Sequence, residues 1–504
     1  MSRSPLSRNS FSRTFIPMLA LLACASFGAL PAHAADAVSA ENGGASVGGT
    51  GGSPQGEAAE VPIGESGSAP AGEAGAKTAD ENSFQFTWGF RERIRQTYIV
   101  NPFDLDDDSA DDLNFFRVRS QLWFDLKAAR GLELYAMINN EHRHYMKPDR
   151  DFDIDEFILE NLYIKAHRIG GSPATLVIGR QNMMLDEGFI YMDGGPLDGS
   201  RTAYMNAARL ILEWEKRSVE AHFLFNPKRD EYVPRVNSKR KPLIEHDELG
   251  AGLRLTEGSL PKTKLTGYYV YKEERSYEGD VRVLDNTIHT IGGRIVGTPL
   301  DGLRLVGEGA YQLWDFDEGN ENAFGGYAYG TYSPEISMKP SFTIGYIYLS
   351  GKEMAEDRWS YVPNEFTGWD PLFSRWPKWS ELYIYTLLRE NGIAYWSNLK
   401  APYMEIKVRP LEQVALRASV FDLSAPYVAP GIRVSKVGEP LMHMRDMLFG
   451  DGTDRGLLTI VKLDWNVTKY LSGHFLWERF EPQDFYGYNR DVSHFLRWEL
   501  YFKY

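Results

Sequence analysis

Arginine occupies every second position in two short segments near the start of the chain: Arg91, Arg93 and Arg95 in the first, and Arg117 and Arg119 in the second. A spacing of two residues places side chains on one face of a β-strand. Guanidinium groups stay charged and bind carboxylate and phosphate groups in a planar geometry. A row of them along a wall of low dielectric raises the local concentration of anions, and rings of arginine or lysine are typical of anion pores. These residues therefore indicate binding and conduction of anions.

The same alternation places further charged side chains on the polar faces of the expected strands. The other basic ones are Arg254, Arg294, Arg304, Arg409, Arg417, Arg497, Lys165 and Lys462. The carboxylates on these faces include Asp125, Glu248, Glu308, Glu478 and Glu499. Two hypotheses stay open. The charges could pair with one another and brace a wall, or the arginines could together form a path for anions.

Other chemistries find little support in the chain. Glu141-His142-Arg143-His144 could suggest a metal site, but its histidines are two residues apart beside a predicted loop, so we expect a solvated loop. Since no Ser/His/Asp grouping stands out, we expect neither enzymatic activity nor a cofactor nor a bound metal. The net charge of −14 argues against nucleic acid as a partner.

The elements that must position the arginines are β-strands, and the last thirteen residues, Val492 to Tyr504, are the clearest example. Leu496, Trp498, Leu500, Phe502 and Tyr504 alternate with polar residues in this segment. A long strand with an apolar face, aromatic residues on that face and an aromatic end is typical of the closing strand of an outer-membrane β-barrel. Aromatic residues make up 13% of the chain and charged residues 25%, which also fits a barrel better than a helical membrane protein.

The chain contains about eighteen segments with strand character. We expect them at residues 83–99, 114–127, 131–142, 156–167, 174–181, 205–216, 218–226, 246–257, 263–273, 287–297, 303–314, 323–333, 339–349, 397–409, 413–423, 456–468, 470–480 and 492–504. The connections alternate between short turns and long loops, the long ones at 100–113, 143–155, 182–204, 227–245, 274–286, 315–322, 350–396, 424–455 and 481–491. An even strand number with short periplasmic turns and long extracellular loops predicts an all-β fold, a single transmembrane antiparallel β-barrel.

A barrel of this size encloses an aqueous lumen, because side chains cannot fill it. The insertions at 351–396 and 424–455 are long enough that they could constrict or cover the lumen, and Leu382 to Leu388 could form a short helix; whether they plug the pore stays open. We also expect the last strand to pair with the strand at 83–99 and so close the barrel.

The N-terminus has the features of a secretory signal peptide over residues 1–34, with a basic start, an uncharged run and an Ala-x-Ala site that predicts cleavage after Ala34. A competing interpretation is lipidation at Cys24, the only cysteine of the chain. Residues 35–82 are rich in Gly, Ala, Ser and Pro, so we expect a disordered leader before the barrel of residues 83–504. The expected location is the outer membrane of a Gram-negative bacterium.

The sequence resembles the alginate export family of outer-membrane porins. The resemblance rests on a strand that ends in Gly179-Arg180-Gln181, on the loop Gly194 to Thr202, and on the loop Trp369 to Pro377. It implies a monomeric eighteen-stranded barrel with an arginine-rich constriction that passes a polyanionic polysaccharide.

By position, the resemblance carries the constriction over to Arg180, and the basic residues of the first two strands to Arg91 and Arg117. Glu160 matches the acidic member of an Arg-Glu pair of the family, although Leu159 stands where the family has the arginine. Glu499 matches an inward acidic residue of the closing strand.

We therefore predict a channel that passes anionic polysaccharide or other anionic solutes through an arginine-lined lumen. Its predicted path contains Arg91, Arg93, Arg117, Arg119, Arg180, Arg254, Arg497, Glu160 and Glu499. The alternatives are a structural or adhesion barrel plugged by its loops and a general uptake porin for small anions. Expected partners are outer-membrane lipid, the anionic substrate, and the barrel-assembly machinery, which would recognise the aromatic C-terminal strand.

Overall fold

The computed structural model describes most of the chain beyond residue 83. The described residues are 84–102, 105–109, 111–128, 131–150, 157–193, 205–228, 247–278, 281–316, 319–351, 368–374, 379–382, 397–428, 433–434, 442–443, 450, 452–487 and 490–504. The predicted signal peptide, its cleavage site, Cys24, the leader, and the expected helix beyond Leu382 lie outside these residues.

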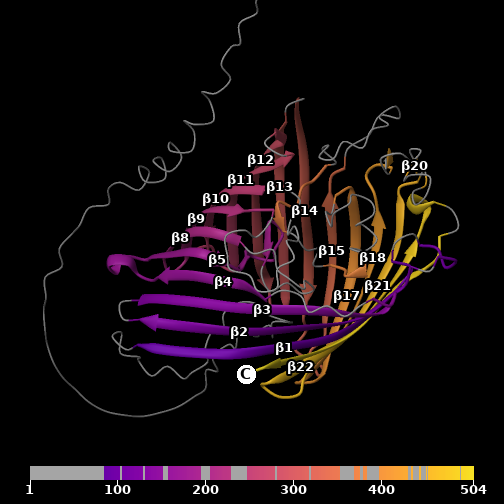
Figure 1. Cartoon of the computed structure of the whole chain (residues 1–504), viewed down its shortest axis with the longest axis horizontal. Helices are drawn as coiled ribbons and strands as arrows, with labels where there is room; N and C mark the ends of the chain where they lie inside the picture. Colours follow the sequence, from indigo (N-terminus) through magenta and orange to yellow (C-terminus); the bar gives the residue numbers. More distant parts are fainter. Residues whose placement is uncertain are drawn as a thin grey trace, which may run out of the picture. The chain divides into compact units, whose positions relative to one another are not determined.

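Eighteen strands form one closed antiparallel sheet, which confirms the predicted barrel (Figure 1). Each strand pairs with its neighbours along the chain, and the last strand pairs with the first. The strands are β1 (Gln85–Val100), β2 (Leu113–Ala128), β3 (Leu132–Lys147), β4 (Phe157–Ala166), β5 (Ala174–Gln181), β8 (Met205–Glu213), β9 (Arg217–Asn226), β10 (Asp247–Glu257), β11 (Thr263–Glu278), β12 (Val281–Leu300), β13 (Leu303–Phe316), β14 (Gly319–Tyr332), β15 (Ser341–Leu349), β17 (Leu399–Leu411), β18 (Val414–Ser424), β21 (Asp454–Asn466), β22 (Leu471–Pro482) and β23 (Ser493–Lys503). Among the described residues, no helix is long and apolar enough to span a membrane.

Burial alternates along the strands as the sequence pattern requires. On β1, Trp88 is 53% exposed and Ile94 is 38% exposed, whereas Arg93 and Arg95 between the outward positions are buried. Large apolar side chains therefore cover the outer face, and charged ones point into the barrel. Glu92 is an exception, because it lies on the outer face of β1 and accepts a hydrogen bond of 2.7 Å from the hydroxyl of Ser120 on β2.

Closure of the barrel follows the predicted pairing of the two ends. The backbone of β23 pairs with β1 over ten residues of each strand, and Glu499 is opposite Arg95. The Tyr504 amide donates to the Phe90 carbonyl (2.9 Å), and the Tyr504 ring packs against Trp88 with centroids 6.0 Å apart. The aromatic end of the chain is thus part of the wall.

Two predicted loops, 274–286 and 315–322, are wrong. β11 ends at Glu278 and β12 begins at Val281, and β13 ends at Phe316 and β14 begins at Gly319. The strict alternation of short and long connections therefore fails at these two hairpins. The reason is that an antiparallel pair satisfies its backbone hydrogen bonds internally, so strands continue where the side chains are already too polar for a membrane. In the same way β3 continues to Lys147, beyond the predicted end at residue 142.

A second, small sheet comes from the insertions after β5 and after β15. β6 (Met183–Met184), β7 (Tyr191–Asp193) and β16 (Phe373–Ser374) form its three strands, and β7 pairs in parallel with β16. We call the described residues around these strands, 182–193 and 368–374, the inner sheet segments. Elsewhere in the described residues, β19 (Arg433–Val434) pairs with β20 (Met442–His443), and two 3-10 turns span Ile169–Gly171 and Asp484–Tyr486.

The inner sheet segments pack against the inside of the wall. Phe189 stacks on Trp369 (centroids 5.1 Å apart), and Tyr191 stacks on Phe373 (5.2 Å). Gly325 on β14 makes room for the indole, since a Cβ there would lie 2.4 Å from Trp369. The buried apolar cluster of the described chain includes this contact between the insertions and the wall. The described residues of the 351–396 insertion, 368–374 and 379–382, therefore contact the inner face of the wall.

Candidate functional site

The inner faces of β1 and β2 carry five buried arginines, which we call the arginine cluster: Arg91, Arg93, Arg95, Arg117 and Arg119. Their exposed fractions are 6%, 3%, 0%, 3% and 2%, respectively. The register of the two strands places Arg93 opposite Arg119 and Arg95 opposite Arg117. Like charges directly opposite each other on a sheet are destabilising. The repulsion between these arginines therefore has to be offset by carboxylates, by mobile anions, or by both.

Two carboxylates from the neighbouring strands enter the arginine cluster. Glu141 on β3 accepts hydrogen bonds from Arg117 and, at 3.2 Å, from Arg93. Glu499 on β23 lies 3.8 Å from Arg93 Nε and 3.7 Å from Arg95 Nη1. Glu141 and Glu499 can together offset two of the five positive charges.

The remaining members of the cluster are less neutralised. Within the described part of the chain, Arg91 and Arg119 form no ion pair, and the buried Nη1 of Arg119 has no hydrogen-bond partner. A guanidinium group in a buried position attracts anions more strongly than one in bulk water, because the effective dielectric is lower. The first two strands therefore present an inner face with excess positive charge.

Part of the 350–396 insertion lies beside this cluster and is held by β22 and β23. Glu478 accepts hydrogen bonds from the hydroxyl of Ser380 and from the amides of Glu381 and Leu382, both at 3.0 Å. The Glu381 carboxylate accepts a hydrogen bond of 3.0 Å from Arg497, which also donates to His474 at 3.2 Å. Arg497 is therefore a structural contact between the insertion and the wall in this structure.

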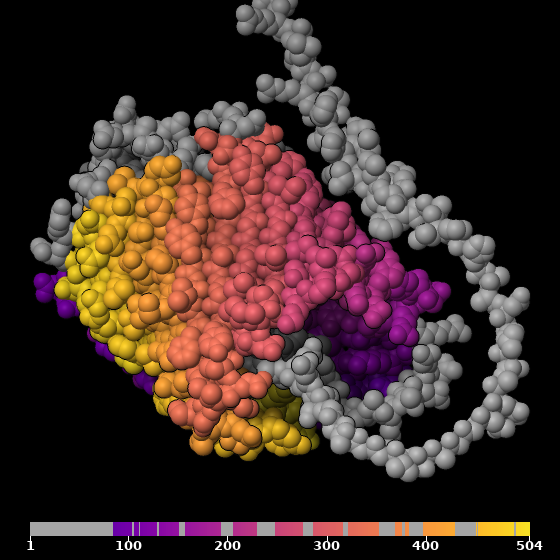
Figure 2. All heavy atoms as spheres, turned by 180° about the vertical axis from the view of Figure 1, so that it is seen from behind, coloured from indigo at the N-terminus to yellow at the C-terminus, as the bar shows by residue number. Residues whose placement is uncertain are grey.

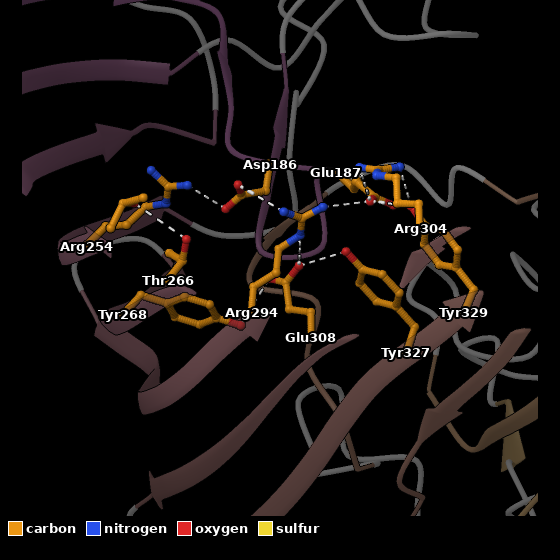
Figure 3. Close-up of polar contacts among 11 residues, drawn as sticks. Asp186, Glu187, Arg254, Thr266, Tyr268, Arg294, Arg304, Glu308, Tyr327 and Tyr329 are labelled. Atoms are coloured by element: carbon orange, nitrogen blue, oxygen red, sulfur yellow. Dashed lines mark hydrogen bonds and ion pairs between the residues drawn. The ribbon is translucent and has the colours of Figure 1, made fainter. Parts of the chain in front are cut away.

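Ion pairs fix the first inner sheet segment to the opposite side of the wall (Figure 3). Asp186 lies 2.7 Å from Arg254 and 3.6 Å from Arg294, and Glu187 lies 2.7 Å from Arg294. Glu187 also accepts a hydrogen bond of 2.6 Å from the Tyr329 hydroxyl. The wall arginines Arg254 and Arg294 thus form ion pairs with carboxylates of the insertion. This favours the bracing hypothesis for this side of the barrel.

The second inner sheet segment is held by a buried lysine. Lys272 on β11 lies 3.1 Å from Asp370, 2.7 Å from Glu274 and 3.7 Å from Glu248. Gln312 on β13 donates to the Asp370 carbonyl (2.6 Å) and accepts from the Asp370 amide (2.9 Å). Burial raises the pKa of Asp370, although the Lys272 ammonium acts in the opposite direction.

Only some of the predicted path residues lie together. Arg91, Arg93, Arg117 and Arg119 lie together on β1 and β2, with Glu499 beside them. Arg180, on β5, donates to the Leu159 carbonyl (2.9 Å) and to Asn206 Oδ1 (3.2 Å), so it links β5 to β4 and β8 and is separate from the cluster. Glu160 is fully buried where the β3–β4 register shifts, and Arg254 and Arg497 contact the insertions.

The sequence interpretation missed the acidic residues that organise this interior. Glu141 belongs to β3 and is 5% exposed, so the expectation of a solvated loop at residues 141–144 is wrong. Asp186, Glu187 and Asp370 come from insertions whose path is not encoded in a local pattern. The only available signal was the pair of adjacent carboxylates, Asp186 and Glu187, which begins five residues after the predicted strand ends at residue 181, in a chain rich in inward arginines.

The chemistry that this interior can perform is ion binding. In the described ranges, no group of three or more His, Cys, Asp or Glu side chains could hold a metal ion. Figure 2 shows that the barrel wall is hollowed on the side opposite to Figure 1, and the inner surface of the indigo N-terminal strands is visible in the hollow. An anion that entered there would face the strands that carry the arginine cluster.

A sequence profile of the protein family described as "Alginate export" matches residues 84–497. Among solved structures, the chain is similar to Pseudomonas aeruginosa OprD at 9% identity, with 83% of this chain and 95% of that chain covered and a TM-score of 0.50, which concerns the fold alone. Two further P. aeruginosa structures are similar at 10% identity: OccK5 (OpdH), with 83% and 98% covered and a TM-score of 0.47, and OpdO, with 83% and 97% covered and a TM-score of 0.49. No curated protein matches the chain in sequence.

Proposed function

Because this chain belongs to the alginate export family, we propose that it carries anionic polysaccharide or other anionic solutes through an arginine-lined path. The chain is a β-barrel channel of the outer membrane. Its proposed role is transport down a gradient, and none of its buried charged groups is assigned a catalytic step.

The observation that supports an anionic substrate is the arginine cluster. Five guanidinium groups lie on adjacent strands, and two of them, Arg91 and Arg119, have no ion pair within the described residues. At a distance of ~8 Å and an effective dielectric between ~20 and 80, one such charge favours a passing anion by about 0.5–2 kcal/mol. Two such charges suffice for clear discrimination of anions from cations.

Membership of the alginate export family favours a polymer over a small anion as the substrate. A polyanion passing along β1 and β2 could contact several guanidinium groups at once, and contacts made by one chain reinforce one another. Since such contacts exchange readily along a repeating polymer, the polymer could slide without leaving the positive surface.

The inner sheet segments support a second candidate, a structural barrel whose insertions close the lumen. Eight residues connect these segments to the wall through ion pairs or hydrogen bonds: Asp186, Glu187, Arg254, Arg294, Tyr329, Lys272, Asp370 and Gln312. Contacts of this number can hold an insertion permanently against the wall. Conductance separates the two candidates.

The test is the current through the purified full chain in planar bilayers, with the reversal potential measured across a KCl gradient. We expect anion selectivity for the wild type and a several-fold lower chloride-to-potassium permeability ratio for the double variant Arg95→Gln/Arg119→Gln. Glu499 retains Arg93 as a partner in that variant, so no buried carboxylate is left alone. The matched control is Arg217→Gln, an exposed arginine paired with Glu257 at a turn, which should leave the ratio unchanged.

Two results would contradict the proposal. Cation selectivity of the wild type would exclude an arginine-lined anion path. An absence of current in the wild type and in an Asp186→Asn/Glu187→Gln variant, with the barrel folded, would favour the closed structural barrel.

A further inference from the structure

A cavity of about 190 Å³ opens on the inner wall between β1, β3, β4, β5 and β8. Lys165 is one residue from the end of β4, and Tyr135 is three residues after the start of β3. The cavity therefore lies toward the end of the barrel that carries the short turns and both barrel termini. In outer-membrane barrels this end faces the periplasm.

A row of three aromatic side chains leads to this cavity across adjacent strands. Trp123 on β2 stacks on Tyr135 on β3 (centroids 6.3 Å, 15° between the planes), and Tyr135 stacks on Tyr163 on β4 (5.2 Å, 19°). The row requires Gly89 on β1, because a Cβ there would lie 2.5 Å from the Trp123 ring. Tyr135 is only 4% exposed, but Tyr163 is partly exposed and lines the cavity at the end of the row.

The lining of the cavity includes three basic residues, which differ in their ion pairs. Arg91 and Lys165 line it, and neither forms an ion pair with another described residue. The third basic residue, Arg209, is already bound to Glu220 at 2.7 Å and to Gln181 at 3.4 Å. Arg91 and Lys165 are therefore the groups available to a negatively charged ligand.

The acidic side chains near the row are Asp125, Glu133 and Glu160; Glu133 is opposite Lys165 in the β3–β4 register, and none of the three lines the cavity. Asp125 lies 3.4 Å from Lys127, and Glu133 lies 3.4 Å from His167. The amides of Asn161 and Asn182, which do line it, bond to each other at 2.9 Å and add neutral donors and acceptors.

This combination fits a specific class of ligand. A pyranose ring has an apolar C–H face that packs on an aromatic plane, and its hydroxyls bond to amides. A carboxylate on the ring binds guanidinium and ammonium groups. We propose that the cavity binds one sugar-acid residue of an anionic polysaccharide, with the ring against Tyr163 and the carboxylate between Arg91 and Lys165.

This sugar-acid subsite rests on the proposed function for its polymeric ligand and deepens it in one respect. The arginine cluster attracts any anion, whereas the subsite requires a sugar ring as well as a charge. At the periplasmic end of the barrel, it would select the polymer where it enters an export channel.

The test is isothermal titration calorimetry of the folded full chain in detergent, which does not depend on conduction. The probes are a trisaccharide of galacturonate, the neutral trisaccharide maltotriose, and citrate, which has three carboxylates but no ring. We expect the galacturonate trisaccharide to bind at least tenfold more tightly than either of the other two. Tyr163→Ala and Lys165→Gln should each weaken its binding about tenfold.

The matched controls are Tyr311→Ala, on the outer face, and Lys262→Gln, at a turn; both residues are exposed and neither should alter binding. Folding of each variant is checked by heat-modifiable migration in electrophoresis. If Tyr163→Ala fails to fold, two other variants test the subsite. Lys165→Gln should weaken binding of the galacturonate trisaccharide, whereas Tyr163→Phe keeps the ring and should keep the affinity.

The outcomes separate this inference from the proposed function. Equal affinity for citrate and the galacturonate trisaccharide, or unchanged affinity in Tyr163→Ala, overturns the subsite even if the channel is anion-selective. Ring-dependent binding that requires Tyr163 supports the subsite even if the bilayer experiment shows no anion selectivity.

Discussion

Replacement of Glu141 by glutamine should raise the anion selectivity of the channel and lower the stability of the barrel at the same time. Glu141 is opposite Arg119 in the β2–β3 register and accepts hydrogen bonds from Arg93 and Arg117. The glutamine keeps the shape and one acceptor oxygen but removes the negative charge from the centre of the arginine cluster.

The two magnitudes follow from the contacts. An anion that passes ~7 Å from this carboxylate, at an effective dielectric of ~40, experiences a repulsion of about 1 kcal/mol, so its removal should raise the chloride permeability roughly fivefold and the chloride-to-potassium permeability ratio by at least that factor. Removal of one partner from a buried ion pair costs about 3–5 kcal/mol, because the other charge stays buried. We therefore expect a lower melting temperature in detergent for Glu141→Gln.

Reversal potentials in a KCl gradient and thermal loss of the heat-modifiable band provide the two measurements. Glu257→Gln is the control, since its partner Arg217 is exposed and the 2.6 Å pair lies at a turn. An unchanged or reduced permeability ratio in a folded Glu141→Gln protein would refute the argument that the arginine cluster faces the conduction path. An unchanged melting temperature would refute the structural role of the carboxylate.

Three further predictions concern other parts of the chain. Deletion of Phe502–Tyr504 should abolish barrel assembly in cells, measured as loss of the heat-modifiable form, because Tyr504 pairs with Phe90 at the closing seam; normal assembly of the truncated chain would contradict this. Mass spectrometry of the mature protein should show a first residue of Ala35, whereas a diacylglyceryl group on Cys24 would show that the chain is a lipoprotein. Acidification from pH 7 to pH 5 should lower the conductance: burial raises the pKa of Asp370 above its ordinary value, so the state in which the second inner sheet segment is docked on the wall holds this proton more tightly than an undocked state, is favoured as the pH falls, and loses this contribution as the pH rises. Asp370 faces Lys272, Glu248, Glu274 and Gln312, and Asp370→Asn should reduce the pH response of the conductance in this range; a pH response equal to that of the wild type would assign the effect to another group.

The structure divides the arginines of the barrel between two roles that the sequence pattern did not distinguish. On β10 and β12, Arg254 and Arg294 are bound to carboxylates of an insertion, so they hold the inner sheet segments. On β1 and β2, the arginines face one another, and Arg119 has no ion pair within the described residues. The channel therefore combines a braced side and a side with excess positive charge.

The sequence by itself determined the barrel and the orientation of its first arginines. Alternation with a period of two is a local property, so it is visible in Arg91, Arg93 and Arg95 and in the apolar residues between them. The same local pattern in Val492 to Tyr504 predicted the closing strand, because a barrel has no free edge and the two end strands must pair. Where most residues of a segment are polar, as from Glu274 to Asn286, the sequence pattern predicts a loop, although the two strands continue and pair there.

Only the tertiary structure decided which charges meet. Glu141 reaches Arg93 across two strands and 48 residues of chain, which requires the registers of β1 with β2 and of β2 with β3. Glu187 meets Arg294 across 107 residues, and Lys272 meets Asp370 across 98, because two insertions fold back against the inside of the wall. Those insertions have no periodic pattern, since their positions are fixed by contacts with the wall and not by their own backbone. The sequence thus specified the wall of the channel, and the fold specified what fills it and where the positive charge stays available.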